Sequence, residues 1–143
     1  MSRVINTDSP TKIRNQHRRT VAEILRRLGQ KQQFDDESKD MAAMLVYLMR
    51  ELWAGVESSA AAWEKRDYWM KAERFMRDWE WTVETAVNIE DVLRHDAFDL
   101  LPELMMELFP RFADVQVKKM TRSPSVWKGA FARLMAEEPT VIG

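Results

Sequence analysis

Between residues 60 and 94, charged and aromatic residues recur at helical spacing and form the clearest candidate binding site in the sequence. At 100° per residue, the angle that a helix imposes, Asp67, Arg74 and Asp78 share one face. Trp63 and Trp81 lie on the same face. Charges on a buried face must be paired, because an isolated buried charge is very costly. These five residues predict a polar pocket for a cationic or planar ligand, or an ion network that fixes how neighbouring helices pack.

Metal chemistry has little support in the sequence. Asp91, His95 and Asp99 follow one another at intervals of four, and carboxylates and imidazoles bind zinc or iron. A di-iron bundle, however, needs two Glu-x-x-His pairs, and neither His17 nor His95 has a glutamate three residues before it. The chain has no cysteine and only 4 glycines, which leaves little for thiolate sites or phosphate-binding loops. We therefore expect no metal and no cofactor, and binding is a better expectation than catalysis.

Basic residues gather near both ends and suggest an alternative function. Residues 10–34 hold seven basic residues and one acid, whereas residues 35–110 have a net charge of −10. Such clusters could contact the phosphates of a nucleic acid. The total charge of −1 and the lack of a base-reading motif make this the weaker hypothesis. Its candidate contacts are Arg14, Arg18, Arg19 and Arg26 in the first helix, and Lys118, Lys119 and Arg122 in the cluster over residues 118–128.

An acidic run over residues 35–40 has two interpretations. Acids at this density can hold magnesium on a diphosphate substrate, with a second acidic pair such as Glu80 and Glu84. The spacing does not reproduce the paired acidic motifs of helical pyrophosphohydrolases. The interpretation that we favour is a helix start, where acids suit the positive end of the helix dipole.

Helical periodicity runs through almost the whole chain and defines the elements that must position these residues. Ser9 and Pro10 predict the start of a first helix, and Gly29 predicts its end. A second helix follows the acidic run, and a break is predicted within residues 55–59 because Gly55 and two serines lie there. The apolar stripe continues across this break, so a kinked helix or one very long helix is an alternative interpretation.

A third helix is predicted over residues 60–94 and would be roughly 50 Å long. A globular chain of this size has a radius of gyration of about 14–15 Å, so this helix would extend beyond a compact body. It is also apolar around most of its circumference, and methionine-rich segments occur within residues 41–49 and 104–106. Methionine adapts to irregular partners. These features favour coverage by a second copy of the chain, a homodimer.

The remainder predicts shorter helices. Residues 96–109 look helical with Pro102 in the first turn, and Ser123-Pro124 predicts the start of a last helix. The fold class is therefore all-α: one domain over residues 1–143, an irregular and possibly elongated bundle of four to six helices, with frayed ends at residues 1–8 and 138–143.

Location and partners follow from exclusion. The longest apolar run, Met41–Met49, has nine residues, against about 20 for a membrane-spanning helix. The first residues lack the apolar stretch of a signal peptide. We expect a cytoplasmic protein without a membrane partner, which acts through contacts with itself and with another protein.

Overall fold

The computed structural model describes residues 8–140, and in this part of the chain every regular element is helical, with no β-strand. The α-helices are α1 (Pro10–Gln30), α2 (Asp36–Glu64), α3 (Trp69–Trp79), α4 (Trp81–Arg94), α5 (Leu101–Leu108) and α6 (Ala130–Ala136). Short 3-10 turns are η1 (Phe98–Leu100), η2 (Phe109–Phe112) and η3 (Pro124–Val126). The predicted all-α, irregular bundle of four to six helices is confirmed.

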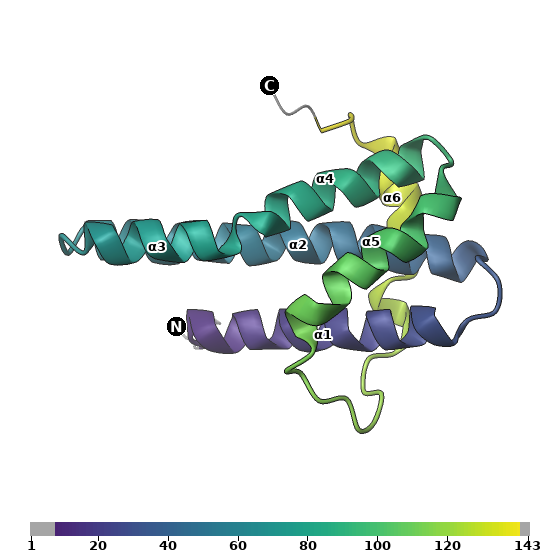
Figure 1. Ribbon diagram of the computed structural model, residues 1–143, viewed down its shortest axis with the longest axis horizontal. Coiled ribbons are helices and arrows are strands. Elements are labelled where there is room, and N and C mark those ends of the chain that lie inside the picture. Colours follow the sequence, from purple (N-terminus) through teal and green to yellow (C-terminus); the bar gives the residue numbers. More distant parts are fainter. Residues whose placement is uncertain (1–7, 141–143) are drawn as a thin grey trace, which may run out of the picture.

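The central element is α2, which packs against α1, α3, α4 and α6. Its apolar stripe, represented by Leu45, Leu52 and Val56, is almost wholly buried. A helix as long as α2 gains most of its stability from such packing. Figure 1 shows α1 and α4 on opposite sides of α2, with α5 crossing in front.

Both predicted helix starts near the N-terminus are confirmed by their caps. The Ser9 hydroxyl accepts a hydrogen bond from the Lys12 backbone N–H, and Pro10 occupies the first turn of α1. The Asp35 carboxylate accepts from the Ser38 backbone N–H, and the Ser38 hydroxyl accepts from the Asp35 backbone N–H, which makes a capping box. The favoured interpretation of the acidic run as a helix start is thus correct.

The predicted break within residues 55–59 is wrong, because α2 continues without interruption to Glu64. Glycine in a helix interior costs only about 1 kcal/mol relative to alanine. The burial of Leu52, Val56 and Ala60 along one stripe outweighs that cost. The continuous apolar phase was therefore a better guide than the glycine.

The chain reverses direction at residues 65–68, inside the predicted third helix, so the single helix over residues 60–94 is wrong. Asp67 adopts a left-handed conformation with φ 64°. The Tyr68 N–H donates to the Trp63 carbonyl and the Asp67 N–H to the Glu64 carbonyl. This is the Schellman pattern that ends many helices, with aspartate where glycine is usual.

A second change of direction at Glu80 separates α3 from α4. Both helices return along α2, α3 through Ala72 and α4 through Ile89 and Leu93. The apolar circumference of the predicted long helix therefore belongs to two helices that each bury their own face. It no longer argues for coverage by a second copy.

The C-terminal third consists of short helices and 3-10 turns joined by irregular segments. Pro102 lies in the first turn of α5, as predicted. The last helix begins at Ala130 and not at Ser123-Pro124, which forms only the turn η3. Gly129, with φ 81°, precedes α6, and the Asp40 carboxylate of α2 accepts from the Gly129 and Phe131 backbone N–H groups. This long-range cap explains the late start of α6.

The predicted frayed ends lie largely outside the described residues. Within the described residues, the Asp8 carboxylate pairs with the Lys12 ammonium group at 3.1 Å. Near the other end, the Thr140 backbone N–H donates to the Glu90 carboxylate at 3.1 Å.

Candidate functional site

The structure gathers three of the five predicted pocket residues. Trp63, Arg74 and Asp78 line a surface depression of about 320 Å³ beside α3. Both charged residues are exposed, and no ion pair within 4 Å joins them in the described part of the chain. Asp67 lies in the turn that ends α2 and does not line the depression. Pairing was expected only if this face were buried, and its exposure removes the need for an ion network there.

Trp81 belongs instead to a chain of aromatic contacts along α3 and α4. Its ring stacks on Trp79 with centroids 5.9 Å apart, and it meets Phe112 edge-on at 5.9 Å. At the α3 end, Phe75 contacts Trp63 at 5.0 Å. Trp63, Trp79 and Trp81 therefore pack on other aromatic rings.

Arginines predicted to contact nucleic acid are largely engaged within the chain. The Arg14 guanidinium lies 4.7 Å from the Phe75 ring centroid. Arg18 pairs with Asp114, and Arg19 donates to the carbonyls of Gln116 and Lys119. Arg18 and Arg19 thus attach residues 111–119 to α1, while Arg14 packs on α3.

Among the remaining candidates, the arginines are engaged within the chain and the lysines are exposed. Arg26 donates to the Val117 carbonyl, and Arg122 donates to the Thr20 hydroxyl at 3.0 Å. Lys118 and Lys119 have exposed side chains. Nucleic-acid binding stays a prediction, and most of its arginines already serve as donors in the fold.

Glu23, the one acid among the basic residues of α1, is completely buried. One carboxylate oxygen accepts from the backbone N–H groups of Thr121 and Arg122 at 2.7 and 2.8 Å. The other accepts from Arg19 Nε at 2.7 Å and from the Thr121 hydroxyl at 2.8 Å. Burial alone would raise the pKa of Glu23, but these hydrogen bonds outweigh it and lower the pKa to about 2. Glu23 therefore anchors residues 121–122 to α1.

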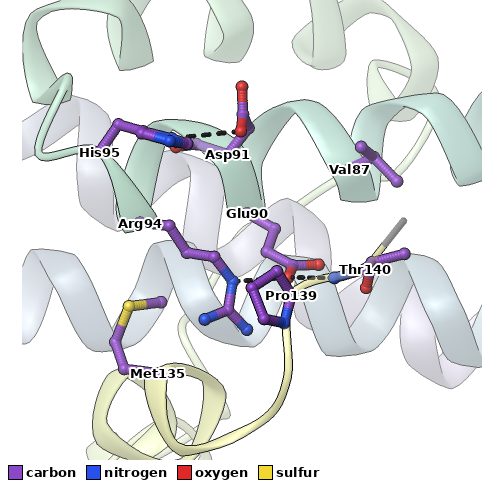
Figure 2. Close-up of a pocket in the computed structure, with 8 residues that line it drawn as sticks. All are labelled: Val87, Glu90, Asp91, Arg94, His95, Met135, Pro139 and Thr140. Atoms are coloured by element: carbon purple, nitrogen blue, oxygen red, sulfur yellow. Dashed lines mark hydrogen bonds and ion pairs between the residues drawn. The ribbon is translucent and has the colours of Figure 1, made fainter. Parts of the chain in front are cut away.

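Glu90 anchors the residues that follow α6 and lines a cavity of about 440 Å³. Figure 2 shows its carboxylate between Arg94 of α4 and the Thr140 backbone. Arg94 Nε donates at 2.7 Å, and Arg50 Nη2 of α2 donates at 3.0 Å. Burial again acts to raise the pKa, and the hydrogen bonds from Arg94, Thr140 and Arg50 lower it to about 2.

His95 and Asp91, which also line this cavity, are not part of a metal-binding group. His95 Nδ1 lies 3.2 Å from an Asp91 carboxylate oxygen, and both side chains are exposed (Figure 2). Within residues 8–140, no three His, Asp or Glu side chains are grouped so that they could hold a metal ion.

An apolar groove of about 390 Å³ between α1, the start of α2 and α5 has a different character. Every lining side chain is apolar, and at its rim Met106 is 76% exposed and Phe109 57% exposed. We call this surface the α5 groove. Its lining residues are Leu25, Leu28, Gly29, Phe34, Ala42, Phe98, Leu101, Pro102, Met105, Met106 and Phe109. Of its features, the sequence indicated only the methionine-rich segment at residues 104–106.

A second exposed apolar surface lies at the turn between α2 and α3. Tyr68, Trp69 and Met70, hereafter the turn patch, follow one another there, and Met70 is 78% exposed. Figure 1 shows this turn projecting beyond the other helices, at the left. Large apolar side chains in contiguous exposed positions mark interaction surfaces more often than isolated ones do.

None of the helices within residues 8–140 combines the length and apolar character that spanning a bilayer requires. Comparison with protein-family models, with curated proteins and with solved structures finds no match to this chain.

Proposed function

We propose that this protein acts by binding polypeptides, beginning with a second copy of itself, through the α5 groove. The observation that carries the proposal is a concave surface whose lining side chains are all apolar, with an exposed rim. Burial of such surface is the main favourable term in protein association. Apolar grooves between helices typically receive an apolar segment of a partner.

The lining chemistry supports binding over catalysis. None of the eleven lining residues has a titratable or nucleophilic side chain. General acid–base and nucleophilic catalysis both need such groups within reach of the substrate. Met105 and Met106 bring unbranched, adaptable side chains that suit a protein surface. With the location that the sequence predicts, this association takes place in the cytosol.

Sedimentation equilibrium over low to high micromolar concentrations tests the proposal. We expect a monomer–dimer equilibrium for the natural chain. Met106→Asp places a charge on the groove rim and should raise the dissociation constant at least about tenfold, the loss typical of an interface hot spot. Because Met106 is mostly exposed, the change should leave the helical circular dichroism unaltered.

Val83→Asp is the matched control. Val83 is another exposed apolar residue, 37% accessible, and it lines neither the groove nor the turn patch. Its substitution should leave the dissociation constant unchanged. A chain that stays monomeric at every concentration, and binds no polypeptide through the groove, contradicts the proposal.

A further inference from the structure

The two exposed apolar surfaces lie at opposite ends of α2. Phe34 of the α5 groove lies two residues before α2 begins, and the turn patch follows its last residue by four positions. With 29 residues, α2 separates them by about 43 Å. The turn patch of one chain therefore cannot fill the groove of the same chain.

Their shapes and residue types match. The turn patch projects from the body (Figure 1), whereas the α5 groove is concave. Tyrosine and tryptophan are the residues that most often anchor protein interfaces when they enter an apolar pocket. Trp69 is 59% exposed, so more than half of its surface stays uncovered by the described residues of its own chain.

Their charges are also opposite. The segment over residues 65–71 holds three basic residues and one acid. The segment over residues 96–109, which includes α5, holds four acids and no lysine or arginine. The α1 side of the groove carries Arg26, Arg27 and Lys31, but these are engaged within the chain. Arg27 and Lys31 pair with Glu37 at 3.4 and 2.9 Å, and Arg26 donates to the Val117 carbonyl. Complementary charge around an apolar contact favours the correct partner and orientation.

We infer that the occupant of the α5 groove is the turn patch of a second copy, an inference that rests on the proposed function. Two copies with antiparallel α2 helices bring each turn patch over the partner's groove. This arrangement satisfies both pairs of surfaces at once and closes as a two-fold dimer, without surfaces left to recruit a third copy.

Two single substitutions test the pairing. Met70→Asp on the turn and Met106→Asp on the groove should each raise the dimer dissociation constant at least about tenfold, while Val83→Asp should not. Raised ionic strength should also weaken the dimer, because salt screens the charges around the contact.

Mixing the two variants gives the sharper measurement. A heterodimer of Met70→Asp and Met106→Asp keeps one intact contact, between the turn of the second and the groove of the first. We expect heterodimers at concentrations where each variant alone is monomeric. Groove-to-groove or turn-to-turn pairing predicts no such recovery and would overturn the inference.

Cross-linking provides an independent readout, since the chain has no cysteine of its own. Met70→Cys mixed with Met106→Cys should form an intermolecular disulfide under mild oxidation, and Met70→Cys mixed with Val83→Cys should not. Equal yields in the two mixtures would count against the pairing.

The outcomes separate the two proposals. If Met106→Asp weakens association and Met70→Asp does not, the groove binds another surface: the proposed function stands and the inference fails. If neither substitution matters, both fail. Binding of the natural chain to vesicles that contain anionic lipid, lost in Met70→Asp while the dissociation constant is unchanged, would assign the turn patch to a lipid surface and overturn the inference.

Discussion

At the scale of single residues, two buried carboxylates hold the irregular parts of the molecule. Glu23 and Glu90 each accept hydrogen bonds from arginines and from the backbone of a segment distant in sequence. A buried carboxylate with its hydrogen bonds satisfied costs little, whereas breaking the cluster leaves an unpaired charge or unpaired N–H groups. These two residues should therefore contribute to the dependence of stability on pH.

Acid should destabilise the protein through Glu23. Its pKa is about 2 in the fold, below the ordinary 4.5, so its contribution is complete above pH 4.5 and disappears as pH falls toward 2. The contribution is roughly 3 kcal/mol by this linkage. Urea unfolding followed by tryptophan fluorescence should show Glu23→Gln losing stability at pH 7, with a smaller further loss on acidification than the natural chain.

Glu73→Gln is the control for that measurement. Glu73 pairs with Arg77 at 2.9 Å, but both side chains are exposed, and exposed pairs contribute little. Its pH profile should follow that of the natural chain. A profile for Glu23→Gln that also coincides with the natural one would refute the role of this carboxylate.

Neither anchor could be identified from the sequence alone. Glu23 stands out there only as a single acid among seven basic residues. Its partners Thr121 and Arg122 lie almost 100 positions later, in a segment without helical periodicity. The same separation conceals why Arg18 and Arg19 are not free to bind an external anion. Chemistry read from local spacing misses contacts that only the fold creates.

At the scale of elements, the two helix starts with local caps were predicted correctly, whereas the start at Ser123-Pro124 and the end of α2 were not. Ser9 and Asp35 were recognisable because their caps are local. The end of α2 was missed because Asp67 adopts a left-handed conformation, which is far more common for glycine than for other residues. That error and the missed break at Glu80 displaced the predicted pocket, since Asp67 and Trp81 left the face on which a continuous helix would have placed them.

Gly55 should be replaceable with a gain in stability. It lies inside α2, and a Cβ added there meets no atom within 4 Å. Gly55→Ala should raise the free energy of unfolding by about 0.5–1 kcal/mol, because alanine restricts the unfolded chain and favours the helix. Urea titration measures the change.

Gly129→Ala should have the opposite effect and serves as the contrast. Space is equally open there, but φ is 81°, a conformation that alanine adopts only with strain. A loss of stability in Gly55→Ala would show that α2 needs its glycine for a reason other than helix geometry.

At the scale of the whole molecule, the architecture was predictable and the interaction surface was not. All-α content follows from periodicity, but the α5 groove combines residues from three separate segments that no local pattern connects. The homodimer was first suggested by a long apolar helix that does not exist. It is now proposed on other grounds: two complementary surfaces at opposite ends of α2.

The anchors also bear on the time at which folding can finish during synthesis. A ribosome adds about 5–20 residues per second, so roughly 5–20 s pass between completion of α1 and addition of Arg122. During that interval Glu23 must stay in water, and α1 cannot settle into its final environment. Chains stopped after Phe112 should be cleaved by a low dose of protease much faster than full-length chains, in a gel time course. Equal cleavage rates would show that the α1–α2–α4 body completes itself without its C-terminal anchor, and a newly made chain would then be protected well before its last helix exists.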